Sequence, residues 1–237
     1  MTTMPSDPDT EITLTRGDLR LVVSPYGVSL RSFYSVVGGE TQEIDAGYSG
    51  ANNKVGGQGD VLVPFPGRVS GGRYLFNGCE YQMVKNDKET PSAIHGFLRT
   101  IIWDQVAATS DSVTFATAFD KNAHAGYPFA LRTQITYTLT HTGLRCDFRI
   151  ENIGDDSAPV GAGFHPYFTV GTDLINENLL SVPFEATLEY KDLIPTGVVL
   201  PVEGSQLDFR EPHAIGETVF NTCYLNPVRD SAGMVHI

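Results

Sequence analysis

Two histidines in aromatic surroundings are the residues of this chain best suited to proton transfer. His165 lies in Gly163-Phe164-His165-Pro166-Tyr167-Phe168, where rings and a proline would fix the imidazole and limit its access to water. His95 lies in Ile94-His95-Gly96-Phe97, ahead of the single tryptophan, Trp103. Imidazole titrates near neutral pH, so both stretches predict acid–base chemistry. The plainer alternatives are a buried structural His165 and a His95 that merely occupies a turn.

An arginine supplies the third candidate. Arg68 ends Pro64-Phe65-Pro66-Gly67-Arg68, a stiff loop that would present a guanidinium to a ligand rich in oxygen. A plain surface arginine is the alternative. Gly96 would let a ligand approach the backbone beside His95, since glycine has no Cβ. Taken together, these residues indicate an enzyme that handles carbohydrate.

Signals for a metal or a cofactor are weak. His95 and His165 are 70 positions apart, and no acidic residue stands at ligand spacing from either. The sequence contains neither G-x-S-x-G nor a phosphate-binding G-x-x-x-x-G-K-[ST]. We predict no metal and no cofactor. The remaining histidines lie in polar turns or near the C-terminus and receive no role: His124, His141, His213 and His236.

Composition narrows the class of protein. The chain has 237 residues, 41% of them hydrophobic, and a net charge of 16 − 28 = −12, which argues against nucleic acid and anionic membranes as partners. Cys79, Cys146 and Cys223 are far apart and predict no disulfide framework. No signal peptide and no run of ~18 apolar residues is present, so we predict a cytoplasmic location.

Alternation of apolar and polar residues with a period of two predicts antiparallel strands. Leu144–Glu151 alternates throughout, and Leu131–Leu139 does so on the other side of the turn His141-Thr142-Gly143, which predicts a hairpin. Asn77-Gly78 between two aromatic stretches predicts a second, tight hairpin. A third is expected from Ile12 to Val23.

These elements predict an all-β protein, a large antiparallel β-sandwich. No window shows helical periodicity, and 24 glycines and 14 prolines separate the short strands. We expect one domain over residues 1–237, with residues 1–11 as a flexible tail. Gln42–Asp60 is expected to be a long loop, and Leu174–Leu180 to hold one helical turn.

The ordered set of motifs resembles the aldose 1-epimerase (galactose mutarotase) family. The resemblance runs from about Gly57 to Phe168, and each motif follows the order found in the family. The motifs are Gly57-Gln58-Gly59, Pro64–Val69, Gly72–Gly78, Ala93–Phe97 with Trp103, Gly126–Phe129, Asn152 and Pro159–Phe168.

The resemblance implies a galactose mutarotase-like supersandwich with a sugar cleft. It implies an isomerase that interconverts the α and β anomers of a free hexose or related aldose, without metal or cofactor. By motif position His165 would be the acid, His95 would bind or polarise the ring oxygen, and Arg68 would hold sugar hydroxyls. Tyr167 and Trp103 are candidates to stack on the sugar. The implied partner is a small-molecule sugar, and the implied assembly is a monomer or homodimer.

The family's base is a glutamate near its C-terminus, preceded by an acidic residue that binds substrate. Asn221 stands at the position that corresponds to this acidic residue. The segment with the glutamate is not found, so the C-terminal part of the family domain is expected to be missing. Three interpretations stay open: a truncated chain, a base supplied by Glu211 or Glu217, or a protein that binds sugar without turning it over.

Overall fold

The structure is a computed structural model, and it describes residues 10–49 and 53–237. It divides into two compact units, which meet in sequence at Gly171 and Thr172 and are described one at a time. Of the expected tail 1–11, residues 1–9 lie outside the described residues, and the first strand begins at Ile12.

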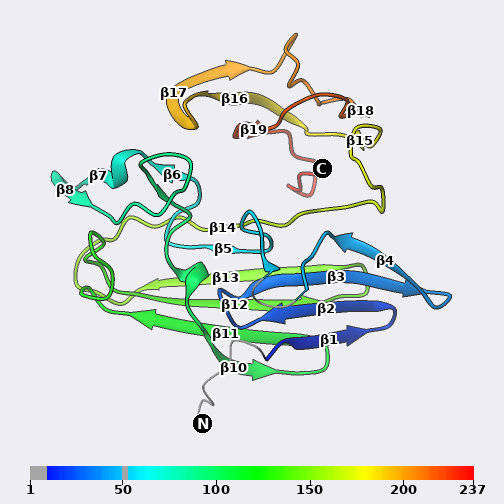
Figure 1. Cartoon of the computed structure of the whole chain (residues 1–237), viewed down its shortest axis with the longest axis horizontal. Helices are drawn as coiled ribbons and strands as arrows, with labels where there is room; N and C mark the ends of the chain where they lie inside the picture. The colour runs from blue at the N-terminus through cyan, green and yellow to red at the C-terminus, as the bar shows by residue number, and fades with distance from the viewer. Residues whose placement is uncertain (1–9, 50–52) are drawn as a thin grey trace. The chain divides into compact units, whose positions relative to one another are not determined.

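Two four-stranded antiparallel sheets make up most of the first unit (Figure 1). One has the strand order β1-β2-β3-β4, and the other has the order β10-β11-β12-β13. The strands of the first sheet are β1 (Ile12–Arg16), β2 (Leu19–Ser24), β3 (Ser29–Val37) and β4 (Glu40–Asp45). Those of the second are β10 (Asp104–Ala108), β11 (Ser112–Phe119), β12 (Leu131–Leu139) and β13 (Leu144–Asn152).

The register of these strands confirms the predicted hairpins. Leu131 pairs with Asn152 and Leu139 with Leu144, around the turn that contains Gly143. Ile12 pairs with Val23 in the first sheet. On the edge strand β10 the register shifts between Gln105 and Ala107, which leaves one extra residue, Val106, in a bulge.

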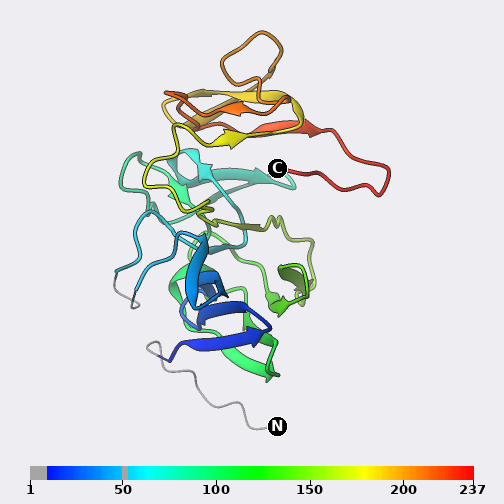
Figure 2. The ribbon, with the colours of Figure 1, turned by 90° about the vertical axis from the view of Figure 1, so that its right-hand side faces the viewer.

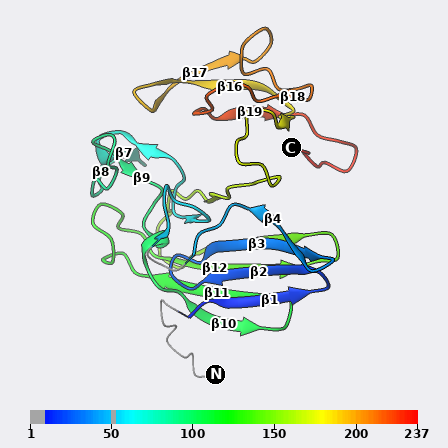
Figure 3. The same cartoon turned by 45° about the vertical axis from the view of Figure 1, so that its right-hand side comes forward.

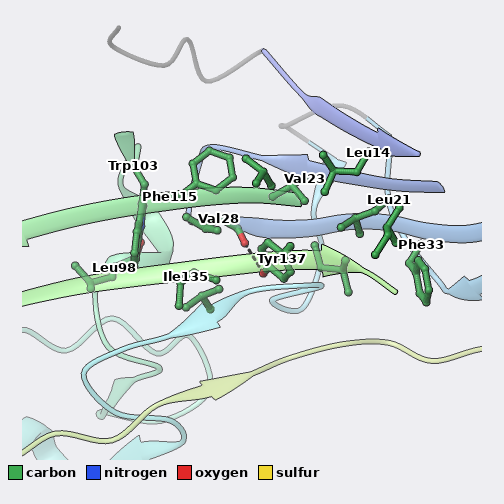
Figure 4. Packing of buried hydrophobic residues seen from close by; sticks show 14 of the residues in the cluster. Leu14, Leu21, Val23, Val28, Phe33, Leu98, Trp103, Phe115, Ile135 and Tyr137 are labelled. Carbon is green, nitrogen blue, oxygen red and sulfur yellow. Dashed lines mark hydrogen bonds between the residues drawn. The ribbon is translucent and has the colours of Figure 1, made fainter. Parts of the chain in front are cut away.

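The inward faces of both sheets contribute to one hydrophobic core (Figure 4). Period-two alternation places Leu21 and Val23 on the inner face of one sheet and Phe115 and Ile135 on that of the other, all fully buried. The Tyr137 hydroxyl donates a hydrogen bond to the backbone oxygen of Val28 (2.8 Å), which links the two sheets inside the core. The expected β-sandwich character of this part of the chain follows from this shared core.

Two expectations about loops need correction. Gln42–Asp60 is not one long loop, because Gln42–Asp45 belongs to β4 and pairs with β3. The alternation there is obscured by polar side chains on a strand at the edge of its sheet. Leu174–Leu180 is a hydrogen-bonded turn from Ile175 to Asn178 (3.0 Å) followed by strand, not a helical turn.

Three short ladders lie beyond the main sheets and carry the predicted motifs. They pair β5 (Val61–Leu62) with β14 (Gly163–Phe164), β6 (Arg68–Val69) with β9 (Ala93–Ile94), and β7 (Arg73–Phe76) with β8 (Cys79–Gln82). The Asn77-Gly78 turn between β7 and β8 has positive φ at both residues (49° and 78°), as a tight primed hairpin turn requires. Short 3-10 turns follow β6 (Ser70–Gly72, η2) and precede Trp103 (Leu98–Thr100, η3).

The second unit is also built from antiparallel strands (Figure 3). In it β16 (Phe184–Lys191) pairs with β17 (Ile194–Pro201) on one side and β19 (Tyr224–Pro227) on the other. A separate ladder joins β15 (Leu179–Leu180) to β18 (His213–Ala214). The chain continues after β19 as a loop (Figure 2). None of the helices in the described part of the chain is long and apolar enough to cross a membrane.

A substitution at Gly96 tests how closely the chain after β9 approaches the chain after β5. It lies at φ 65°, and a Cβ placed there would be 2.1 Å from the carbonyl oxygen of Val63. We expect Gly96→Ala to lower the free energy of unfolding by more than about 3 kcal/mol, because a backbone clash adds to the cost of the left-handed conformation. Urea denaturation followed by Trp103 fluorescence measures this.

Gly78→Ala is the matched control for this variant. Gly78 has a similar φ of 78° but nothing within 4 Å of its added Cβ. It should therefore lose only the dihedral cost of about 1–2 kcal/mol. Equal losses in the two variants would show that the approach of Val63 to Gly96 is not a tight constraint.

Candidate functional site

A single backbone contact brings the two histidine motifs together. Val63 follows β5 and forms a parallel bridge with Gly96, which lies two residues after the end of β9. The Val63 oxygen accepts hydrogen bonds from the N–H groups of Phe97 (3.1 Å) and Leu98 (3.3 Å). The ladder that His165 follows is thus joined to the ladder that His95 follows.

The two imidazoles meet edge to face. Their ring centroids are 5.3 Å apart with planes at 81°, although the residues are 70 positions apart in sequence. The Tyr167 ring stacks on that of His165, with the ring centroids 5.4 Å apart and the planes at 25°. The structure thus brings His95, His165 and Tyr167, three of the predicted site residues, together.

His95 is held in one tautomer and kept neutral. The backbone N–H of Gly67 donates to its Nδ1 (3.0 Å), so the proton of the neutral ring sits on Nε2. Burial lowers the pKa of His95 to about 4, and the neighbouring His165, Arg99 and Arg68 act in the same direction. At neutral pH, His95 can therefore donate a hydrogen bond through Nε2 without carrying charge.

His165 is held by its backbone while its ring stays available. Its N–H donates to the carbonyl oxygen of Asp60 (3.0 Å), and its own carbonyl accepts from Gly59 N–H (2.9 Å). Among the hydrogen bonds of the described residues, none uses a ring nitrogen of His165, and neither nitrogen is buried without a partner. The imidazole is thus reachable from solvent and free to exchange a proton with a ligand.

The stretch after His165 is anchored by a buried carboxylate. Asp45, at the end of β4, accepts a hydrogen bond from the Tyr167 N–H (2.8 Å) and pairs with Phe168. Burial raises the pKa of Asp45 to about 6, against the opposing effect of that hydrogen bond. The Tyr167 hydroxyl donates to Gly56 O (3.0 Å). The tyrosine is therefore held both at its backbone N–H and at the tip of its side chain.

Arg68 stands on the strand beside His95 and is held by two carboxylates. Its Nε donates to Asp87 (2.8 Å) and its Nη2 to Glu89 (2.5 Å). The Asp87 side chain is nearly buried, and hydrogen bonds from Arg68 and Thr90 hold its pKa well below the ordinary range in spite of desolvation. The guanidinium is therefore positioned by the protein before any ligand arrives.

A buried ionic cluster, which the sequence did not reveal, lies beside His165. Asp60 is fully buried, and its two oxygens accept from Lys54 Nζ (2.6 Å) and Arg99 Nη1 (2.9 Å). The only hint in the sequence was an acidic residue between glycines and the apolar run Val61-Leu62-Val63. Its partners are 6 and 39 positions away and follow no motif.

Two sequence interpretations of this region were wrong. Trp103 cannot stack on a ligand, because it is fully buried in the core and its indole N–H donates to the Leu98 carbonyl (2.9 Å). The space beside Gly96 is filled by the backbone of Val63 rather than left for a ligand. His124 lies in a turn, as expected, and its ring stacks on that of Phe97 with the ring centroids 3.6 Å apart.

The remaining predicted residues belong to the second unit. Asn221 is exposed just ahead of β19, and Glu211 is exposed just ahead of β18. Glu217 accepts a hydrogen bond from Asn176 Nδ2 (3.2 Å). In the described residues, no three His, Cys, Asp or Glu side chains gather in a group that could hold a metal ion.

Comparison with known proteins finds a matching family and several similar sequences. A family model described as aldose 1-epimerase matches residues 10–236. The uncharacterized protein YihR of Escherichia coli K12 is 35% identical over 161 residues, which are 68% of this chain and 52% of that protein. Galactose mutarotase of Rattus norvegicus is 30% identical over 166 residues, 67% of this chain and 47% of that protein. The chain thus spans about half the length of these curated relatives.

Solved structures show the same fold. The GalM/aldose epimerase homologue of C. elegans superposes with a TM-score of 0.79 at 21% identity, covering 87% of this chain and 65% of that one. A putative aldose 1-epimerase of Escherichia coli K12 gives a TM-score of 0.71 at 26% identity, covering 86% and 66%. The predicted galactose mutarotase-like antiparallel fold is confirmed.

The low pKa of His95 predicts a pH-dependent contribution to stability. Between pH 4 and 6.5 the unfolded chain binds a proton at this residue that the folded chain excludes, so the contribution grows as pH rises through that window. His95→Asn removes it, while asparagine tolerates the positive φ of 60° and can still accept from Gly67. We expect the stability difference between wild type and variant to grow by about 2 kcal/mol across the window, after allowance for partial exposure.

Urea denaturation at several pH values measures this difference. Asp45 titrates in an overlapping window with the opposite sign, because its pKa is raised, but it is present in both proteins and cancels. A difference that stays constant from pH 4 to 6.5 would contradict a neutral His95.

The pairing of Arg68 with Asp87 predicts a structural cost for removing the arginine. Arg68→Ala would leave the nearly buried Asp87 carboxylate unpaired, so we expect a loss of about 3 kcal/mol at pH 7. Because the pKa of Asp87 is lowered in the folded state, this loss should shrink as pH falls below about 4. Arg73→Ala is the control, since Arg73 forms an exposed pair with Glu80 at 3.8 Å and should cost less than about 0.5 kcal/mol. Similar losses in the two variants would mean that Asp87 does not depend on Arg68.

Proposed function

Because the chain belongs to the aldose 1-epimerase family, we propose that it is a mutarotase acting on a free hexose or a related aldose. The observation that carries this proposal is the pair of histidines at 5.3 Å, one neutral and oriented and the other open to solvent. Arg68 on the adjacent strand supplies a fixed guanidinium of the kind that binds sugar hydroxyls.

The proposed reaction needs one acid and one base. A base takes the proton of the anomeric hydroxyl while an acid gives a proton to the ring oxygen, and the bond between the anomeric carbon and that oxygen breaks. The aldehyde then turns about its bond to the rest of the sugar and closes again with the opposite configuration. No atom is gained or lost, so side chains that exchange protons are sufficient.

We assign these tasks to different residues of the site. His165 is the proposed acid, because its ring nitrogens are not engaged by the protein. His95 is proposed to bind the ring oxygen. The Gly67 N–H occupies its Nδ1, which leaves the Nε2–H as the donor for the sugar. Tyr167, 36% exposed and stacked on His165, is a proposed contact to the sugar. Arg68, on the strand next to that of His95, is proposed to bind sugar hydroxyls.

The proposed base is a carboxylate, and the carboxylates that lie beside the histidine motifs in the described part of the first unit already have protein partners. Asp60 and Asp87 each face cations that hold them as structural anions. Glu211 and Glu217 remain the candidates that this chain offers, with Asn221 as a proposed hydrogen-bonding residue for substrate. The commitment of Asp60 and Asp87 to cations favours a second candidate function, the binding of sugar without turnover.

His165→Asn tests the role of the acid. It keeps similar volume but removes the titratable ring, so we expect mutarotation of fresh α-glucose and α-galactose to fall by at least about 100-fold, with little change in melting temperature. Polarimetry measures the rate. His141→Asn is the matched control, because His141 sits in the exposed turn between β12 and β13 and should leave the rate unchanged.

The same assay separates the two candidate functions. No acceleration over buffer with wild-type protein and several aldoses would rule out the enzyme for this chain. Calorimetric titration with the same sugars would then show whether binding survives. Full activity in His165→Asn would remove His165 from the acid's role. The small-molecule partner, the cytoplasmic location and the oligomeric state stay predictions from the sequence.

A further inference from the structure

In the buried ionic cluster of Lys54, Asp60 and Arg99, every carboxylate oxygen is paired with a cation. Both oxygens of a carboxylate with no exposed surface are taken by different cations, at 2.6 and 2.9 Å. Burying three charges costs desolvation that their attraction does not reliably repay, so such a cluster is weak evidence for stability alone. The Nε of Arg99 is moreover buried without a hydrogen-bond partner, a further cost. The cluster therefore calls for a reason other than stability.

Backbone contacts tie this cluster to His165. The carbonyl of Asp60 accepts from His165 N–H (3.0 Å), and Gly59 N–H donates to the His165 carbonyl (2.9 Å). Asp60 N–H in turn donates to the Gly57 carbonyl (3.0 Å), which closes the turn that leads into β5. Any rotation of the Asp60 backbone would carry the histidine with it.

The charged atoms and the His165 ring both border the space beside Gly57. A Cβ placed on Gly57 would lie 3.3 Å from Asp60 Oδ2 and 4.0 Å from both Arg99 Nη1 and His165 Cδ2. The charges act on His95, since Arg99 lowers and Asp60 raises its pKa. Arg99 itself follows His95 by four residues, in η3, so the cluster connects both histidine motifs.

We propose that Asp60, clamped between Lys54 and Arg99, is a positioning residue that holds His165 in the geometry required for proton transfer. This inference rests on the proposed mutarotase function. Asp60 itself does not exchange protons with the sugar, because both oxygens are occupied. Its carboxylate fixes the Gly56–Asp60 turn and Arg99 in one arrangement, and the backbone bonds pass that arrangement to His165.

Asp60→Asn is the central test, because it keeps the shape of the side chain and removes its charge. We expect kcat for mutarotation to fall by about 10- to 100-fold with KM changed less than about threefold, since a small displacement of an acid slows chemistry more than binding. Asp147→Asn is the matched control. Asp147 pairs with Arg145 on an exposed face of β13, and its loss should change neither constant.

Single removals of the cations provide a second route if Asp60→Asn does not fold. Lys54→Met leaves Asp60 with one cation, and Arg99→Lys keeps the charge but loses the planar guanidinium. Both should lower kcat, with KM again nearly unchanged. Wild-type kcat in folded Asp60→Asn, or in both cation variants, would overturn the inference.

A spectroscopic readout separates this inference from the proposed function. In protein labelled at histidine, NMR should show that the His165 ring signals shift or broaden in Asp60→Asn and not in Asp147→Asn. The pKa of His95 should fall further in Asp60→Asn and rise in Arg99→Gln. If wild type proves inactive, these spectra still decide the matter: unchanged His165 signals would refute the positioning role, and changed signals would support it without turnover.

Discussion

The approach of the Val63 carbonyl to Gly96 is the constraint on which the site depends. Two short ladders, each too small to be stable alone, are joined only because residue 96 has no side chain in the way. The Val63 oxygen also caps the turn that leads to η3 and Arg99. One backbone oxygen thus sets the distance between His95 and His165 and the direction from which Arg99 reaches Asp60.

Local patterns predicted the fold well because β-hairpins are local objects. The alternation in Leu131–Glu151 and the Asn77-Gly78 turn were sufficient to predict strands, partners and buried faces. The pattern failed at β4, where the polar residues of an edge strand do not alternate. It failed again at Trp103, because the sequence cannot tell whether an aromatic ring near a motif faces a ligand or the core.

The candidate site was predictable only in part, for a similar reason. His95, His165 and Arg68 stand in motifs rich in glycine, proline and aromatic residues, and these signals are visible in the chain. Asp60 and Asp87 gain their importance from partners elsewhere in the fold, and no spacing rule connects Asp60 to Arg99. Such contacts give the site its two kinds of histidine: one held neutral by its surroundings, the other held by its backbone with a free ring.

The bulge in β10 has a consequence for the behaviour of this protein at high concentration. An exposed edge strand offers a regular row of N–H and C=O groups on which a second molecule can add a strand. The extra residue at Val106 interrupts that regular spacing in the middle of a five-residue strand, and Asp104 puts a charge at its start. The β10 edge is therefore a poor template for sheet extension between molecules, which protects the sandwich from growth into ordered aggregates along this side.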